Sequence, residues 1–297
     1  MKHIEKFILP YLVALLLPMS AAAQVQPTDN ILPHIPDQNF RNAIRQIMPQ
    51  CDTDGDGKLS SAEAAKVEEL SLRIYVQNDR FSEDLSLIIP QHSVYPYFHP
   101  KQLKEKTDSL TVKSLKGIEY FTGLVELYCA DNDLTELDLS QNINLETLIC
   151  YNNNISKLNV SKNTKLKELE CSYNNLSELD VSSCSELNKL GCYSNHLSEL
   201  NLTENSALEM LDCGGRKLQK LRIGNCSNLK YLDCSDADLT ELDLSGNVKL
   251  NYLNTRDNPN LKTVWVWEGF DTNNPQSHIH PVWPDREYEN ITFKVKK

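Results

Sequence analysis

Carboxylate side chains alternate along one short segment, residues 52–63, which reads DTDGDGKLSSAE. Asp52, Asp54 and Asp56 stand at every second position, and Glu63 ends the segment. Hard divalent cations such as Ca²⁺ are bound by oxygen ligands, and a glycine allows the chain to turn sharply around the ion. The chemistry that this segment can perform is therefore cation binding.

The segment 52–63 matches the EF-hand calcium loop at each of its defining positions. Gly57 stands where that loop turns, and Leu59 stands at its apolar position. The alternative is an acidic, glycine-rich surface turn that binds no metal. The expected Ca²⁺ ligands are the carboxylates of Asp52, Asp54 and Asp56, the backbone carbonyl of Lys58, Ser60 acting through water, and bidentate Glu63.

Apolar residues recur at helical spacing on both sides of this loop, which predicts a helix before it and a helix after it. We expect residues 24–70 to form a helical cap that covers the first turn of the structure that follows. A calcium sensor would expose a methionine-rich groove, but Met48 is the only methionine between residues 24 and 70. The residues that carry the pattern are Phe40, Ala43, Ile44 and Ile47 before the loop, and Ala64, Ala65, Val67 and Leu70 after it.

A cysteine recurs every 21 residues from residue 129 to residue 234, within the shared pattern LxxLxCxxNxLxxLxLxxNxx. Leucines at these offsets and at a fixed period are the signature of a leucine-rich-repeat solenoid. We expect this fold over residues 113–266, with parallel short strands on the concave face and few helices in the repeats. The six cysteines are Cys129, Cys150, Cys171, Cys192, Cys213 and Cys234.

In a short strand alternate side chains face opposite ways, so the fourth-position leucine and the sixth-position cysteine of each copy face inward. Neighbouring thiols then point the same way, which is poor geometry for a disulfide, and a straight row cannot converge on zinc. Cys184 and Cys226 lie two turns apart, too far to bond. A recurrent asparagine is expected to satisfy backbone groups at the turns; it stands at Asn132, Asn153, Asn174 and Asn195, and Arg216 and Ala237 replace it.

These repeats resemble those of the bacterial internalins, in particular the internalin-J type, in which a stacked cysteine also replaces one core leucine. The resemblance covers roughly residues 113–266. It implies a secreted or surface-attached recognition protein, and we expect it to bind a protein or glycan ligand. The segment from Ile35 to the calcium loop also looks like the N-terminal segment that precedes the repeats in some secreted bacterial proteins.

Outward-facing positions of the strands carry several tyrosines, which combine a large apolar surface with a polar tip. We expect them to form the ligand-binding part of the concave face. The alternative is that strand surfaces accept tyrosine because of its β-propensity alone. The residues are Tyr128, Tyr151, Tyr173, Tyr193, Tyr231 and Tyr252.

The first 23 residues combine a basic start, an apolar stretch and a run of small residues, which predicts a cleaved secretory signal peptide. We therefore expect export, to the periplasm, the cell surface or the medium, and no transmembrane segment in the mature chain. The net charge of −11 disfavours nucleic acid as a partner. We expect a monomer.

Residues 71–112 are expected to connect the cap to the repeats, with a strand over 72–76 that pairs with 109–112. The insertion between them, with His92 and His99, is either a specificity loop or a packed flap. Residues 267–297 should form a C-terminal cap, with Val264 and Val266 inward before it. We expect no enzyme activity. The alternatives are a structural or inhibitory cell-envelope protein that assembles with another bacterial protein and, more remotely, a hydrolase within 71–110.

Overall fold

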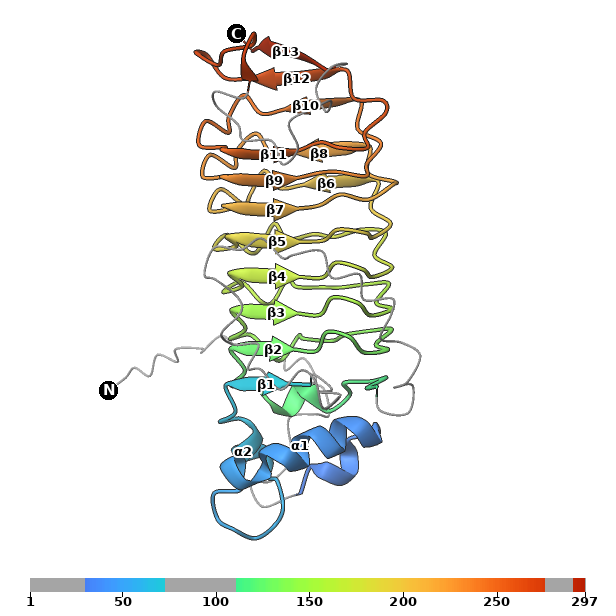
Figure 1. Cartoon of the computed structure of the whole chain (residues 1–297). Coiled ribbons are helices and arrows are strands. Elements are labelled where there is room, and N and C mark those ends of the chain that lie inside the picture. The colour runs from blue at the N-terminus through green and yellow to red at the C-terminus, as the bar shows by residue number, and fades with distance from the viewer. Residues whose placement is uncertain (1–29, 73–110, 276–290, 297) are drawn as a thin grey trace, which may run out of the picture.

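The computed structural model describes residues 30–72, 111–275 and 291–296. Their strands stack as the turns of one column (Figure 1). One side of the column is an eight-stranded parallel sheet, which we call the long sheet and which is the side expected to be concave. Its strands, in spatial order, are β1 (Glu69–Ser71), β2 (Glu126–Tyr128), β3 (Thr147–Ile149), β4 (Glu168–Glu170), β5 (Lys189–Gly191), β7 (Met210–Asp212), β9 (Tyr231–Asp233) and β11 (Tyr252–Asn254).

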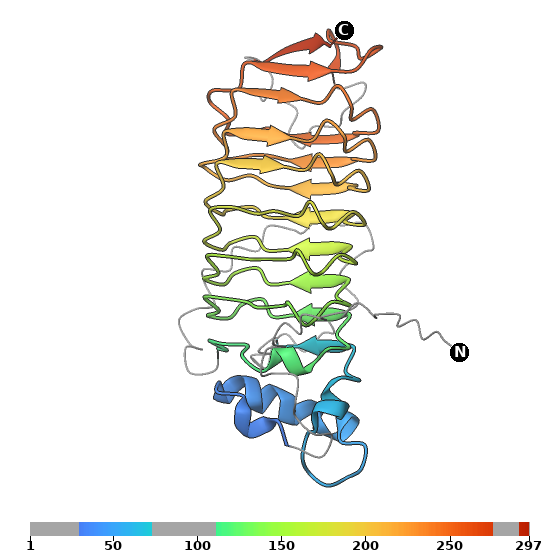
Figure 2. The same cartoon turned by 180° about the vertical axis from the view of Figure 1, so that it is seen from behind.

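The opposite side of the column carries shorter pieces of sheet, which Figure 2 shows from behind. A two-stranded sheet is followed by a three-stranded one, and earlier copies contribute only a bridge between Leu137 and Leu158. Within residues 111–274 the only helix is the single 3₁₀ turn η6 (Ile118–Tyr120). The prediction of a leucine-rich-repeat solenoid with few helices is therefore confirmed. The strands on this side are β6 (Glu199–Asn201), β8 (Lys220–Arg222), β10 (Glu241–Asp243), β12 (Thr263–Val266) and β13 (Thr292–Val295).

Each strand of the repeats pairs with the equivalent strand of the next copy, so like residues stack on like. Leu127 of β2 pairs with Leu148 of β3, which pairs with Leu169 of β4. The six ladder cysteines are at most 2% exposed, and all nine cysteines of the chain are unpaired. Burial raises the pKa of Cys129 to about 12, so this thiol stays protonated at neutral pH.

Buried asparagines link successive turns through their side chains. The Nδ2 group of Asn174 donates to the carbonyl oxygens of Cys150 and Cys171, both at 3.0 Å, and its Oδ1 accepts from the backbone N–H of Ile155 at 2.9 Å. One side chain thus satisfies backbone groups of its own turn and of the turn before it. Asn132, Asn153 and Asn195 make the equivalent bonds, and the column resumes at Asn258 after its interruption.

A second column of buried side chains runs along the other side of the solenoid. Its hydrogen bonds to the backbone were not predicted from the sequence pattern. Asn205 donates to the carbonyl oxygens of Val181 at 2.9 Å and Cys184 at 3.0 Å. Cys226 uses its thiol for the same purpose, with Sγ 3.3 Å from the carbonyl oxygen of Leu202. Cysteine thus replaces asparagine as the donor here; the column reads Asn142, Asn163, Cys184, Asn205, Cys226 and Asn247.

The N-terminal segment contains η2 (Leu32–His34), α1 (Gln38–Cys51) and the short α2 (Ser61–Ala64). The helix predicted before the loop is present, with Phe40 and Ile44 buried along it. The prediction that the second helix runs on to Leu70 is wrong. Its backbone becomes extended because Glu69–Ser71 pairs in parallel with β2, and Leu70 enters the core as part of β1.

The expected strand over residues 72–76 and its partner 109–112 lie largely outside the described residues. Leu72, which is described, donates its backbone N–H to the carbonyl oxygen of Tyr128 at 2.8 Å and so continues β1. The insertion with His92 and His99 lies wholly outside the described residues.

The N-terminal segment packs directly on the first turn of the repeats. The rings of Phe40 and Phe121 lie 6.4 Å apart, and both are fully buried. Asp37 begins α1 by accepting from Phe40 N–H at 3.0 Å, while its other oxygen accepts from Lys113 N–H at 2.8 Å. A single carboxylate thus joins the helix start to the solenoid.

At the far end, Val264 and Val266 are fully buried, which confirms their predicted inward direction. Residues from the tail add a last strand, because β13 pairs in parallel with β12. Trp267 lies edge-on against Phe270, with ring centroids 4.9 Å apart, and Phe270 stacks on Phe293 of β13. The histidines of the tail, His278 and His280, lie outside the described residues.

The asparagine column generates a stability prediction. Replacing Asn174 with alanine leaves the Ile155 N–H and the Cys150 carbonyl buried without this partner, and should lower the free energy of unfolding by about 3 kcal/mol. Asn175→Ala is the matched control, because this neighbour is exposed. Urea denaturation measures both variants; equal effects would show that the column does not carry the stability assigned to it.

Candidate binding face and metal loop

The loop at residues 52–63 is folded around its first aspartate. The two oxygens of Asp52 accept the backbone N–H groups of Gly55 at 2.8 Å and Gly57 at 2.9 Å. Both glycines have left-handed backbone conformations, with φ of 73° and 77°. Other residues adopt this conformation with strain, so the glycines allow the loop to close.

Glu63, the last residue of the loop, is 6% exposed and holds the two ends of the loop together. One carboxylate oxygen accepts from the backbone N–H of Ser60 at 3.0 Å, and the other accepts from the backbone N–H of Thr53 at 2.7 Å. These hydrogen bonds lower the pKa of Glu63 to about 2, and the bond from Ser60 has the larger effect. The carboxylate is therefore ionised over the physiological pH range.

Carboxylate oxygens of Asp52, Asp54 and Glu63 all lie within 4.8 Å of one another. Calcium–oxygen distances are about 2.3–2.6 Å, so ligands on opposite sides of one ion are separated by about this amount. The oxygen-only donor set and its spacing therefore fit Ca²⁺. Asp56 is exposed and lies 3.4 Å from the ammonium group of Lys58, outside this group of three.

Ser60, another expected ligand, immediately precedes α2 as its N-cap. Its hydroxyl accepts from the backbone N–H of Glu63 at 3.2 Å, in a capping box. The apolar residue of the loop, Leu59, is fully buried, and its carbonyl oxygen accepts from the N–H of Ile31 at 2.8 Å. Residues 30–31 thus pair with the backbone of this loop, in the place where a second loop would otherwise be its hydrogen-bonding partner.

All six predicted tyrosines lie on the outward side of the long sheet, which we call the long-sheet face. Each of them is partly buried. Tyr128, Tyr231 and Tyr252 belong to strands β2, β9 and β11, and Tyr151, Tyr173 and Tyr193 stand two or three residues after the ends of β3, β4 and β5.

The tyrosines form separate groups, two of which are pairs, and not one continuous row. Tyr231 and Tyr252 stack with ring centroids 4.0 Å apart, and Tyr173 and Tyr193 lie 5.6 Å apart. At the other end of the face, the hydroxyl of Tyr128 donates to a neighbouring carboxylate at 2.6 Å.

The ring of Tyr193 lies over a glycine of the next turn. A Cβ atom on Gly214 would come within 2.8 Å of its Cε2. Its hydroxyl reaches past this glycine and donates to Asp236. The ring can therefore adopt this orientation only because Gly214 has no side chain.

Three carboxylates on the same face are largely withdrawn from solvent, although nothing in the sequence pattern indicated it. Glu170 is 9% and Asp233 is 6% exposed, and the Oδ1 atom of Asp212 between them is buried and accepts no hydrogen bond from a described residue. Burial raises the pKa of Glu170 and, together with the charges of Asp233 and Glu170, that of Asp212. The position within each copy was visible in the sequence, but the burial was not.

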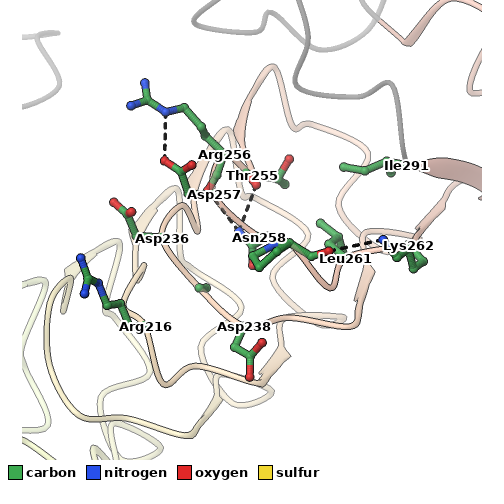
Figure 3. Close-up of a pocket in the computed structure, with 12 residues that line it drawn as sticks. Arg216, Asp236, Asp238, Thr255, Arg256, Asp257, Asn258, Leu261, Lys262 and Ile291 are labelled. Atoms are coloured by element: carbon green, nitrogen blue, oxygen red, sulfur yellow. Dashed lines mark hydrogen bonds and ion pairs between the residues drawn. The ribbon is translucent and has the colours of Figure 1, made fainter.

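A cavity of about 970 Å³ opens where the first asparagine column is interrupted (Figure 3). Arg216 and Ala237, which stand in place of the asparagines, both line it. It contains charges of both signs, including the ion pair of Arg256 and Asp257 at 3.2 Å. The hollow thus lies beside the interruption of the column, and its mixed charge does not favour ligands of one sign.

Comparisons with known proteins support the fold. No protein-family model matches the sequence, and no curated protein matches it. Among solved structures, the functional domain of InlJ from Listeria monocytogenes, which includes a cysteine ladder, superimposes with a TM-score of 0.63 at 24% identity, over 92% of this chain and 62% of that domain. Internalin C2 of the same organism gives a TM-score of 0.44 at 18% identity, over 94% of this chain and all of that one. A leucine-rich-repeat protein of Leptospira interrogans gives 0.46 at 19%, over 61% and 46%.

The chain therefore has the cysteine-ladder leucine-rich-repeat fold expected from its sequence and spans less than two thirds of the InlJ domain. Within the described residues, no helix combines the length and the apolar content needed to cross a membrane.

The carboxylate of Asp212 generates a prediction about pH. Because the folded state raises the pKa of Asp212, protonation of this carboxylate stabilises the fold. This stabilisation is complete below the ordinary pKa of 3.8 and is lost as the pH rises through the raised pKa. Asp212→Asn keeps the shape and removes the ionisation. The variant should therefore be more stable than the parent at pH 8, by on the order of 1 kcal/mol, and should lose this advantage near pH 4.

Urea denaturation at several pH values measures this difference. Glu178→Gln, at an exposed position, is the control for loss of one charge. A parent and an Asp212→Asn variant of equal stability at pH 8 would contradict the prediction.

Proposed function

We propose that the chain is an exported, non-enzymatic recognition protein that binds a protein or glycan through the long-sheet face, with Ca²⁺ bound at residues 52–63. The observation that carries this proposal is the set of partly exposed tyrosines on a face whose backbone is fixed from behind. Every strand of the long sheet is hydrogen-bonded into the column, and the inward side chains are buried.

Binding through such a face requires little ordering of the protein. The rings are already held, as in the Tyr231–Tyr252 stack and the Tyr193–Asp236 hydrogen bond. When a partner buries these rings, apolar contact is gained and this chain loses little conformational entropy. Leucine-rich arcs recruit outward strand positions for binding because the fold constrains only the inward ones. The InlJ domain also includes a cysteine ladder, and at 24% identity it supports the fold alone.

In this proposal, Asp52, Asp54 and Glu63 hold Ca²⁺ through their carboxylates, with Asp56, Lys58 and Ser60 as the further ligands expected from the loop. The ion would supply positive charge to three acidic groups that otherwise repel one another. The loop lies beside α1 and α2, which pack on the first turn of the repeats. Binding of Ca²⁺ would therefore stabilise the covered end of the solenoid and leave the long-sheet face unchanged.

One prediction from this proposal concerns the tyrosines. A variant in which Tyr128, Tyr151 and Tyr193 are all changed to alanine should capture a surface ligand at least tenfold more weakly than the parent does. The reason is that Tyr and Trp contribute much of the binding energy of such interfaces. Pull-down from host and bacterial surface extracts, quantified for a ligand captured by the parent, measures this loss.

The matched control changes three exposed residues in one column of the opposite side, Glu136, Lys157 and Glu178, to alanine. It should capture the ligand as the parent does. Thermal melting confirms that both variants are folded. Unchanged capture by a folded tyrosine variant would remove the assignment of the long-sheet face.

Another prediction from this proposal concerns calcium. Addition of Ca²⁺ at 100 times its dissociation constant should stabilise the chain by about 2.7 kcal/mol, and removal by a chelator should reverse the effect. Glu63→Gln should abolish the calcium-dependent shift of the melting temperature. The control Glu68→Gln, at an exposed position of the same segment outside the loop, should retain it. The site would be refuted if Ca²⁺ did not shift the melting temperature of the parent, or if Glu63→Gln retained the shift.

A further inference from the structure

We propose that Glu170, Asp212 and Asp233, with the rings of Tyr193 and Tyr231 beside them, form a binding site for a primary ammonium or guanidinium group on a polypeptide partner. The inference rests on the proposed function and specifies the partner's chemistry. It names a lysine or arginine side chain as the group that the long-sheet face receives.

The three carboxylates occupy one row across adjacent strands. In the register of the long sheet, Glu170 pairs with Gly191, Gly191 with Asp212, and Asp212 with Asp233. Strands in a sheet are spaced by about 4.8 Å. Gly191 would separate Glu170 from Asp212, but Glu170 leans over it: a Cβ atom on Gly191 would lie 1.8 Å from Oε2 of Glu170. The missing side chain thus brings the first carboxylate toward the second.

The row consists of three acidic side chains, and within the described part of the chain no lysine, arginine or histidine forms an ion pair with any of them. Asp233 is satisfied by Ser235 and by Nδ2 of Asn254 at 2.8 Å, and Glu170 accepts from Ser172 N–H at 2.9 Å. The Oδ1 atom of the Asp212 carboxylate is buried and accepts no hydrogen bond from the described residues. The cation on the intervening strand, Lys189, pairs instead with Glu168 at 3.4 Å.

The fold itself does not require carboxylates at this position. The same place in the register is occupied by Ile149 on β3, Gly191 on β5 and Asn254 on β11. A buried carboxylate without a partner destabilises a protein, whereas one that receives a cationic donor forms a strong, charge-assisted hydrogen bond. Asp212 keeps a partly exposed surface on the long-sheet face, so a partner's side chain can reach it.

Aromatic rings lie on both sides of the row. The ring of Tyr193 covers Gly214, two residues after Asp212, and Tyr231 stands two residues before Asp233 and is backed by its stack on Tyr252. Cations are attracted to the faces of such rings. A small metal ion is disfavoured, because the only described group whose ligand atoms converge within 4.8 Å is the one at residues 52–63. The site is therefore suited to a larger organic cation.

The test uses calorimetry on the folded full chain with Ca²⁺ present. The probes are pentalysine, pentaarginine, fully Nε-acetylated pentalysine and spermidine. Pentalysine or pentaarginine should bind, and the acetylated peptide should bind at least tenfold more weakly. Asp212→Asn should weaken binding of the basic peptide at least tenfold, whereas Glu178→Gln, which removes the same charge from the opposite side, should change it less than twofold.

Loss of binding in Asp212→Asn cannot be attributed to unfolding, because this substitution is expected to stabilise the chain, and thermal melting checks that it does. Equal weakening by both variants, or no binding of either basic peptide, would overturn the inference. Binding of spermidine alone would also overturn it, because the cation would then not come from a polypeptide. A surface ligand whose capture depends on the tyrosines and not on Asp212 would leave the proposed function standing and remove only this inference.

Discussion

Hydrogen bonds between each turn and the next, made by buried side chains as well as by strands, are the interaction on which the rest of the structure depends. A solenoid turn with almost no helix leaves many carbonyl and N–H groups inside the protein, and each of them needs a partner. Asn174 illustrates the solution, since it bonds to Cys150 one turn earlier and to Cys171 in its own turn. This arrangement works only if every copy has the same length, which explains the constant period.

The same constraint separates the residues of the fold from those of the surface. Inward positions repeat because they must fill the same space and satisfy the same backbone groups in each copy. Outward positions of the long sheet are free of this requirement, and there the chain carries tyrosine, carboxylate, methionine, lysine and glycine in turn. Where the inward rule itself fails, at Arg216 and Ala237, the structure opens into a cavity.

Features set by period and by local pattern could be predicted from the sequence, and features set by a neighbour's side chain could not. The parallel strands, the buried cysteines and the helix around Phe40 follow from spacing alone. The extended conformation at Leu70 does not, because it depends on pairing with β2, more than fifty residues later in the chain. The site shows the same division: the positions of Tyr193 and Glu170 were predictable, but their orientations depend on space left by Gly214 and Gly191.

The interchange of asparagine and cysteine in the second column has a consequence for how such chains can change in length. Asn205 and Cys226 donate to carbonyls at the same sequence offset, so one copy can follow another whichever donor it carries. Gain or loss of a whole copy would then move the two parts of the column apart or together by one strand spacing, about 4.8 Å, with the small rotation that each repeat adds. The separation between the loop at residues 52–63 and the acidic row would thus change in steps of one repeat, while each group stays on the same side of the solenoid.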